Sequence, residues 1–165
     1  MQHIFVDPEK CTGCKTCEIS CRIEHSQSKN LFTAPFEPHP PRTRIFVESF
    51  NDHNFPIQCR HCSEPPCVSA CMSGALIKNV KNGLTEHIEE KCIGCFMCVM
   101  ACPFGVINRS SDSRIIVKCD RCPESGYPQC VKSCPTHALT LQDIPEEENH
   151  KRRQYLTSFF QKKEV

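Results

Sequence analysis

The sequence lacks several features that commonly build a core, a membrane anchor or a nucleic-acid surface. Its 165 residues include no tryptophan, and the hydrophobic share is only 39%. No stretch approaches the roughly 18 apolar residues of a membrane span, and Met1–Lys10 has no apolar segment typical of a signal peptide. A formal charge of +1 argues against nucleic-acid binding. We therefore expect a cytoplasmic protein of one compact domain or two small ones, with no membrane span and no nucleic-acid partner.

Familiar catalytic patterns are missing too. The chain contains no Gly-rich phosphate loop and no Ser/His/Asp pattern of nucleophilic catalysis. A nucleotide or flavin site would have to lie on a partner. We therefore expect that the chain itself is not an enzyme.

What the sequence has in abundance is cysteine, with sixteen residues in four groups of four. The third group runs from Cys92 to Cys102 and precedes Pro103, with the spacing C-x2-C-x2-C-x3-C-P. In this pattern three thiolates on one loop hold an iron–sulfur cluster, and the fourth thiolate ligates another cluster. The first group repeats the spacing, and the second and fourth widen its middle gap, which indicates an internal duplication. The other groups are Cys11, Cys14, Cys17 and Cys21; Cys59, Cys62, Cys67 and Cys71; and Cys119, Cys122, Cys130 and Cys134.

Zinc and disulfides are the competing explanations for so many cysteines. A zinc site built from two separated C-x2-C pairs leaves the third cysteine of the first and third groups without a role. Disulfides are disfavoured in the cytoplasm, and cysteines three apart on a tight loop pair poorly. We therefore predict four [4Fe–4S] clusters, with iron bound through all sixteen cysteines and with folding dependent on them. A structural zinc-binding interaction module is the alternative of another class.

The segments between the cysteines predict short elements. A Pro-rich surface loop is expected after a short helix at 18–25. Asn82-Gly83 predicts a hairpin. Strands are expected at 3–6, 44–50, 75–80, 84–88, 105–107, 114–117 and 138–141.

The tail from 144 to 165 contains no cysteine. Acidic residues precede basic ones along it, which suits a helix dipole. Leu156, Phe159 and Phe160 recur at the spacing of one helical face. We expect a helix whose apolar face packs on the protein's own body or docks on a partner subunit, and the pattern leaves both open.

Charged and titratable residues lie beside the cysteines. The basic ones are Lys10, Lys15, Lys91, Lys118 and Arg121. They either offset the negative charge of the clusters or are solvated surface charge. Three histidines, His25, His61 and His137, are also near the groups. We expect none of them to be a ligand, because cysteine already supplies sixteen.

From Ile4 to about Leu141 the chain resembles the four-cluster ferredoxin-like electron-transfer subunits of modular oxidoreductases. These enzymes include dimethylsulfoxide reductase, formate dehydrogenase, formate hydrogenlyase, aldehyde oxidoreductase and carbon monoxide dehydrogenase. The four ordered groups, with their widened second and fourth gaps, carry the resemblance. It implies an α+β fold of two interleaved bacterial-ferredoxin-like [4Fe–4S] modules with short strands, short helices and a C-terminal helical tail. The implied outer module is 1–50 with 109–143, the inserted inner module is 51–108, and the tail is 144–165.

The resemblance also implies how the groups share ligands, since in that family the first group pairs with the fourth and the second with the third. The implied ligand sets are set A, Cys11, Cys14, Cys17 and Cys134; set B, Cys59, Cys62, Cys67 and Cys102; set C, Cys92, Cys95, Cys98 and Cys71; and set D, Cys119, Cys122, Cys130 and Cys21.

Two segments narrow the resemblance. Glu24–Phe32 and Phe55–Cys62 look most like the carbon monoxide dehydrogenase subunit. This implies a chain that relays electrons in anaerobic metabolism between that catalytic partner and a second redox protein, such as a hydrogenase or a flavin oxidoreductase. The alternatives are a subunit of a tungsten or molybdenum aldehyde oxidoreductase or of a formate dehydrogenase, and a free-standing polyferredoxin.

Overall fold

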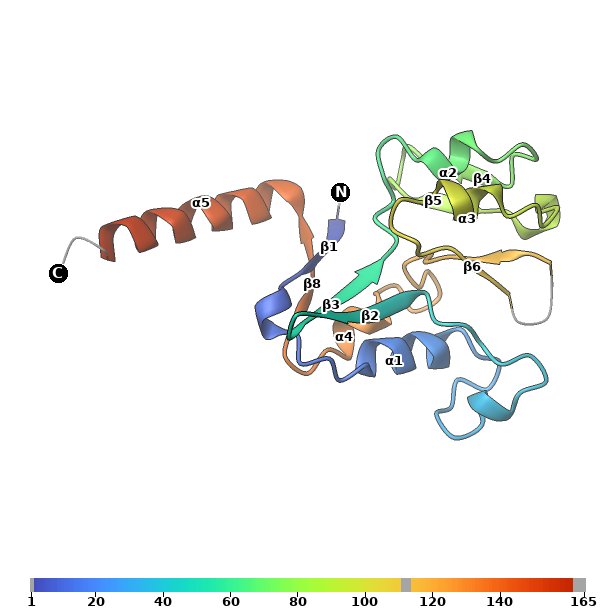
Figure 1. The fold of residues 1–165 in the computed structure, drawn as a ribbon, viewed down its shortest axis with the longest axis horizontal. Coiled ribbons are helices and arrows are strands. Elements are labelled where there is room, and N and C mark those ends of the chain that lie inside the picture. Colours follow the sequence, from blue (N-terminus) through green and yellow to red (C-terminus); the bar gives the residue numbers. More distant parts are fainter. Residues whose placement is uncertain (1, 111–113, 162–165) are drawn as a thin grey trace.

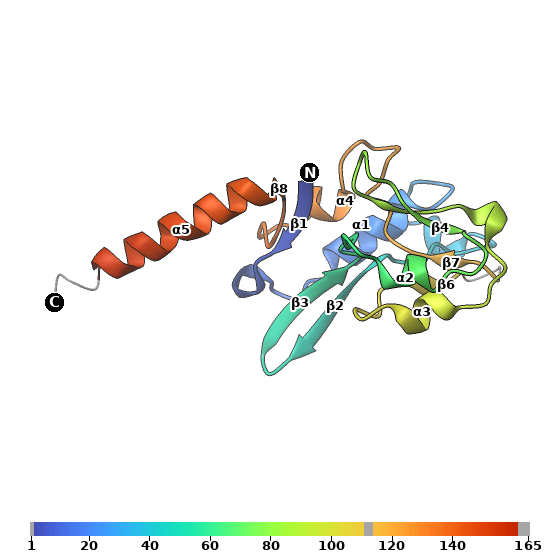
Figure 2. The same cartoon turned by 90° about the horizontal axis from the view of Figure 1, so that it is seen from above.

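The computed structural model describes residues 2–110 and 114–161, apart from the side chains of residues 146, 147, 149, 150 and 158–161. It shows a body of short elements from which one long helix projects (Figures 1 and 2). The helices are α1 (Thr16–Glu24), α2 (Pro66–Ser69), α3 (Met97–Ala101), α4 (Gln129–Lys132) and α5 (Ile144–Gln161), with 3-10 turns η1 (Pro8–Lys10), η2 (Ala34–Phe36) and η3 (Glu89–Lys91). The strands are β1 (Gln2–Val6), β2 (Ile45–Phe50), β3 (His53–Gln58), β4 (Leu76–Lys78), β5 (Thr85–His87), β6 (Asn108–Arg109), β7 (Ile116–Val117) and β8 (Leu139–Asp143).

The strands form four antiparallel pairs, and one pair joins the two ends of the cysteine-rich region. β1 pairs with β8 so that Ile4 lies opposite Leu141. The other pairs are β2 with β3, β4 with β5, and β6 with β7. α1 packs against α4, where the Ser20 hydroxyl donates to the carbonyl oxygen of Gln129 at 3.0 Å. α2 packs against α3 in the upper part of the body in Figure 1.

The predicted hairpin is present, but its loop is longer than residues 81–83, which lie between the expected strands at 75–80 and 84–88. β4 and β5 pair around a longer loop that is closed by a hydrogen bond from the Asn79 N–H to the Leu84 carbonyl oxygen. The Asn79 side-chain oxygen also accepts from the Lys81 N–H, which stabilises the wider turn locally. Gly83 keeps the positive φ, +71°, that the sequence suggests.

Two strand predictions need correction. β3 was not predicted, although Asn51 and Asp52 before it both adopt positive φ and form a tight turn typical of two-residue hairpins. Residues 105–107 were predicted as a strand, but β6 begins only at Asn108. Val106 and Ile107 are instead almost fully buried, so their apolar character reflects packing and not sheet pairing.

The surface segments follow the sequence in outline. The Pro-rich insertion is an exposed loop with the short turn η2, and Phe32 and Phe36 are 79% and 86% exposed. The tail is helical through Gln161, and its last four residues lie outside the described part. Leu156 is 52% exposed, and the side chains of Phe159 and Phe160 are not described, so packing on the body and docking on a partner both stay predictions. Among the described helices, none is long and apolar enough to cross a membrane.

Cysteine supplies much of the interior. The body has two small cores rather than one large one. The first core contains the aliphatic residues Ile45, Val47, Val131 and Leu139 together with Cys17, Cys21 and Cys130. The second contains Leu76, Ile107 and Ile116 together with Cys67 and Cys98.

Candidate iron–sulfur sites

The four cysteine loops share one backbone feature. The residue just before the second cysteine of each group has a left-handed conformation, with φ of +71° at Gly13, +49° at His61, +67° at Gly94 and +66° at Arg121. Left-handed residues in such loops turn successive N–H groups toward one side, which favours an anionic group there. Glycine adopts this conformation freely, whereas His61 and Arg121 each incur about 1–2 kcal/mol of strain.

The first group lies against the end of the fourth. Cys11 and Cys134 pack on the core that contains Cys17. Burial raises the pKa of Cys17 to about 12, and the neighbouring charges of Cys14 and Cys11 add to the shift. Cys14 itself is exposed and accepts a hydrogen bond from the Thr16 hydroxyl at 3.4 Å. The structure therefore brings the members of set A to one region.

Cys21, the last cysteine of the first group, lies beside the cysteines of the fourth group. All four cysteines of set D are buried. Burial raises the pKa of Cys130, and the charges of Cys119, Cys21 and Cys122 add to the effect. The helix α1 places Cys21 there because it lies one turn after Cys17 and faces α4.

The last cysteines of the second and third groups each lie beside the other group. Cys71, Cys92, Cys95 and Cys98 line a single pocket together with Gly94 and Phe96. Burial raises the pKa of Cys67, and the charges of Cys59 and Cys102 act in the same direction. The four cysteines of set C thus lie together, and so do Cys59, Cys67 and Cys102 of set B. Cys62, the remaining member of set B, lies with Cys59 near the ammonium group of Lys78.

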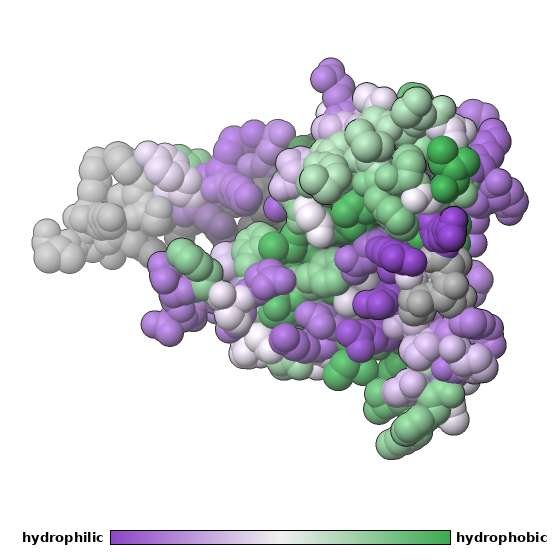
Figure 3. Space-filling view, turned by 45° about the vertical axis from the view of Figure 1, so that its right-hand side comes forward, coloured by the Kyte–Doolittle hydropathy of each residue, from purple (hydrophilic) through white to green (hydrophobic). Residues whose placement is uncertain are grey.

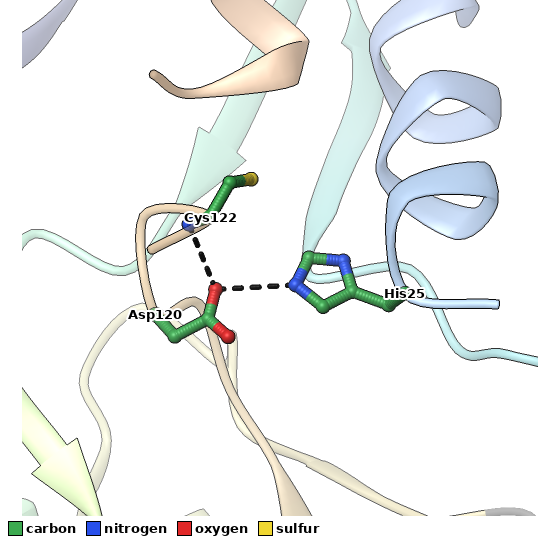
Figure 4. Close-up of side chains that lie close together, drawn as sticks. All are labelled: His25, Asp120 and Cys122. Atoms are coloured by element: carbon green, nitrogen blue, oxygen red, sulfur yellow. Dashed lines mark hydrogen bonds and ion pairs between the residues drawn. The ribbon is translucent and has the colours of Figure 1, made fainter. Parts of the chain in front are cut away.

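A polar network holds the fourth loop on the end of α1 (Figure 4). His25 Nε2 lies 3.1 Å from Asp120 Oδ1, which also accepts from the Cys122 N–H at 3.0 Å. Arg44 pairs with the other oxygen of Asp120. Although burial works against it, the hydrogen bond from His25 and the charge of Arg44 hold the pKa of Asp120 well below its usual range. Burial lowers the His25 pKa, but the interactions with Asp120 and Cys21 together outweigh it and raise the pKa to about 9.

Three groups of this network lie close enough to share a metal ion, namely His25, Asp120 and Cys122, whose candidate ligand atoms are within 4.8 Å of one another. Their hydrogen bonds and the ion pair with Arg44 already account for the arrangement. The sequence did not single out Asp120 or Arg44. The two residues are 76 positions apart, so no local pattern predicts that they pair. The charged residues beside the fourth cysteine group are the only hint of such a network.

The basic residues beside the cysteines divide into two kinds. Lys10, Lys15 and Lys91 are exposed, and Lys10 pairs with Asp7 at 2.8 Å. Lys118 is only 4% exposed, and Arg121 is partly buried. The surface-charge interpretation therefore holds for the first three residues, and only the last two are placed to offset charge in the interior.

The residues present fit iron–sulfur clusters. Thiolate sulfur is the ligand that such clusters use, and the chain supplies sixteen free cysteines for it. Burial raises the pKa of Cys119 to about 12 and that of Cys122 and Cys98 each to about 11. Thiolates at these positions require a cation to offset the loss of solvation, and iron supplies that charge.

Gly94 provides a test of the loop geometry. A Cβ atom at this position would overlap the carbonyl oxygen of Arg114 and lie 2.9 Å from its Cβ. We expect Gly94→Ala to displace the loop between Cys92 and Cys98, to lower the thermal midpoint and to reduce the iron content by about a quarter, one cluster of four. Thermal unfolding and iron analysis of the purified chain measure both effects.

Gly105 is the matched control for this substitution. Its φ of +61° is close to that of Gly94, but a Cβ atom there meets nothing within 4 Å. Gly105→Ala therefore carries the backbone strain of about 1–2 kcal/mol without the overlap. If both variants lose iron equally, the contact with Arg114 is not the cause.

Comparison with known proteins places the chain in a family. A model of the 4Fe-4S dicluster domain matches residues 51–144, and a model of the 4Fe-4S binding domain matches residues 8–24. An iron-sulfur protein of Rhodospirillum rubrum is 33% identical over 157 residues, covering 86% of this chain and 82% of the relative. The electron transport protein HydN of Escherichia coli (strain K12) is 33% identical, covering 86% of this chain and 88% of that protein.

A third relative comes from an archaeon. The polyferredoxin-like subunit of an aliphatic sulfonate oxidoreductase of Pyrococcus furiosus is 39% identical over 131 residues, covering 79% of this chain and 70% of the subunit. The matched regions include all four cysteine groups between them. The chain belongs to the ferredoxin-like family of [4Fe–4S] electron-transfer proteins and oxidoreductase subunits.

Proposed function

We propose that the chain is an electron-transfer subunit that carries four [4Fe–4S] clusters, one in each of sets A to D, and relays electrons between a catalytic redox partner and a second redox protein. The observation that supports this most is the proximity of the sets to one another. Cys130 of set D and Cys17 of set A lie in the same small core. Burial raises the pKa of Cys119 in set D, and the nearby charge of Cys59 in set B adds to the effect.

The same reasoning connects the remaining set. Burial raises the pKa of Cys98 in set C, and the charge of Cys67 in set B contributes. The sets therefore follow one another in the order A, D, B, C. A row of this kind is what a relay requires, because an electron passes only between neighbouring sites.

The ends of the row reach the surface. Cys14 in set A and Cys95 in set C are exposed, whereas every member of set D is buried. Exposed apolar residues surround the Cys95 end, including Ile93 at 67%, Met100 at 83% and Met72 at 88%. Figure 3 shows apolar residues over much of this upper part of the body. The two ends suit contact with two different partners.

The protein's own residues have a supporting role in this function. When bound, the clusters supply one-electron carriers whose irons are all held by cysteine, so substrate chemistry at the metal is not expected. The loops fix the spacing between the sets. Val131 and Leu139 on one side and Ile107 and Ile116 on the other exclude water from the interior. Exclusion of water and fixed dipoles near the thiolates set the potentials.

We retain the interleaved arrangement of two ferredoxin-like modules as part of the proposal. The contacts between α1 and α4 and between β1 and β8 join the first and last parts of the chain, whereas α2 and α3 contact each other. The proposed module boundaries, after residue 50 and after residue 108, do not fall in linkers between separate units. The turn between β2 and β3 follows residue 50, and residues 108 and 109 form β6.

Carbon monoxide dehydrogenase is the catalytic partner that we favour, on the basis of the segments Glu24–Phe32 and Phe55–Cys62. A tungsten or molybdenum aldehyde oxidoreductase or a formate dehydrogenase is the second candidate. The relatives that carry the names polyferredoxin-like subunit of an aliphatic sulfonate oxidoreductase and probable chain of an anaerobic dimethyl sulfoxide reductase support it. The second redox partner would be a hydrogenase or a flavin oxidoreductase.

Metal analysis of the anaerobically purified chain tests the proposal. We expect about sixteen irons and about sixteen sulfides per chain, with no zinc in stoichiometric amount. Four [4Fe–4S] centres should be reducible by a low-potential reductant. Zinc in place of iron would establish the structural interaction module instead.

Anaerobic co-purification of the tagged, full-length chain identifies the partner. A nickel-containing carbon monoxide dehydrogenase in the complex would support the first candidate, and a molybdenum or tungsten enzyme would support the second. Isolation of a fully loaded chain without any partner would favour a free-standing polyferredoxin. Added chain should accelerate electron flow from the identified enzyme to an acceptor protein.

A further inference from the structure

Three cations, Lys78, Lys118 and Arg121, lie between the second and fourth cysteine groups, and we name them the cation cage. Lys118 is buried, and the other two are partly buried. The Lys118 ammonium donates to the carbonyl oxygens of Thr85 and Cys119. The Lys78 ammonium donates to the carbonyl oxygens of His61 and Gly83 at 2.7 and 2.6 Å. Backbone carbonyls thus hold both ammonium groups in fixed positions.

Carboxylates do not neutralise the cage. Within the described residues, the ion pairs include no carboxylate bound to Lys78, Lys118 or Arg121. The adjacent Asp120 is taken by His25 and Arg44. Glu86 senses Lys118, but its hydrogen bonds go to Asn79 and Asn82. A buried cation without an anion is costly, so an anion is expected close to the cage.

The thiolates closest to the cage belong to sets B and D. Burial lowers the pKa of Lys78, and the charges of Cys62 and Cys59 oppose that shift. Burial also lowers the pKa of Arg121, and the charges of Cys119, Cys59 and Cys130 oppose it. Lys118 in turn favours the thiolate forms of Cys67 and Cys119. The cage therefore faces the two middle sets of the proposed row.

His61 lies at the centre of the cage. It is 2% exposed, and its Nδ1 accepts a hydrogen bond from the Thr85 N–H at 3.0 Å. Because Nδ1 accepts this hydrogen bond, the ring is not doubly protonated, and His61 is neutral. The three cage residues therefore carry the local positive charge.

The repeat shows that the cage is specific to two of the four loops. His61 and Arg121 occupy the left-handed position that glycine occupies in the first and third groups. Lys118 precedes the first cysteine of its group, as Lys91 does in the third, yet only Lys118 is buried. Side chains thus replace glycine, despite the backbone strain, only where the cage forms.

We propose that the cation cage raises the reduction potentials of the sites in sets B and D above those of sets A and C, so that an electron entering the row rests in its middle. This inference depends on the proposed four-cluster function. Reduction adds one negative charge to a site without making or breaking a bond. Fixed cations in a poorly solvated interior stabilise that added charge more than exposed ones do.

A redox titration of the loaded Lys118→Met variant, monitored by electron paramagnetic resonance, tests the proposal. At a fixed potential we expect the reduced-to-oxidised ratio of one or both middle sites to fall about tenfold, which corresponds to about 59 mV for a one-electron couple. The sites of sets A and C should be unchanged. Lys118→Arg, which keeps the charge, should restore most of the ratio.

Lys91→Met is the matched control, because Lys91 precedes the first cysteine of its group but is exposed. It should leave all four potentials close to those of the parent chain. The signals are assigned by comparison with Cys102→Ala, in which the site of set B is expected to be lost. Unchanged potentials in fully loaded Lys118→Met, or a shift confined to sets A and C, would overturn the proposal.

Lys78→Met provides a second test if Lys118→Met does not load iron. Its ammonium lies on the side of Cys62 and Cys59, so the site of set B should shift. An unshifted set B in the loaded variant counts against the cage. The proposed function fails separately, if the parent chain itself does not contain about sixteen irons.

Discussion

Cys102→Ala is expected to remove the iron–sulfur site of the second cysteine group and to spare the site of its own group. Cys102 and Cys67 lie in the same small core, and Cys102 is one of the charges that raise the pKa of Cys67. The pocket that contains Cys92, Cys95 and Cys98 is completed by Cys71. The variant should lose about four of about sixteen irons, and the lost signal should be that of set B.

Cys71→Ala is the reciprocal variant, since it removes the last cysteine of the second group. It should abolish the signal of set C and leave that of set B. Iron analysis gives the number of sites lost, and resonance spectra of the reduced proteins show whether the two variants lose different signals. Loss of the Cys92 site in Cys102→Ala, with the Cys59 site intact, would refute the exchange of ligands between the groups.

The spacing of the cysteines predicted most of what defines the candidate sites. Short spacings dictate which three thiols share a loop, because three residues cannot separate two thiols widely. The strand at 138–141 and the strand at 3–6 were also predicted, but their pairing as β8 and β1 joins the two ends of the region and is not a local property. The exchange of the fourth ligands came from the resemblance, because spacing alone does not say which groups face each other.

The sequence does not predict which of the residues beside the cysteines are buried. Lys91 and Lys118 occupy the same place in the repeat, yet one is exposed and the other is 4% exposed. The difference arises because β5 lies over the fourth group, so that Thr85 offers its carbonyl to Lys118. Val106 and Ile107 show the same limit: their apolar character predicts a strand, but it reflects burial and not pairing.

Removal of iron is expected to unfold the body of the protein. The first core has only four buried aliphatic residues and the second only three, and the remaining members of both are cysteines. Each buried aliphatic side chain contributes about 1.5–3 kcal/mol, whereas ordering the backbone costs about 1–2 kcal/mol for every residue. The free energy of cluster binding is therefore part of the free energy of folding.

A chelator applied to the full chain under reducing conditions should abolish the cooperative thermal transition and the protection of β1, β4, β5 and β8 against hydrogen exchange. The reductant prevents disulfides from replacing iron as cross-links. Helical signal from α5 is not a measure of the body, because this helix projects from it (Figures 1 and 2). Reconstitution with iron and sulfide should restore the transition. An iron-free chain that keeps a cooperative transition at the original temperature would show that the two small cores suffice without clusters.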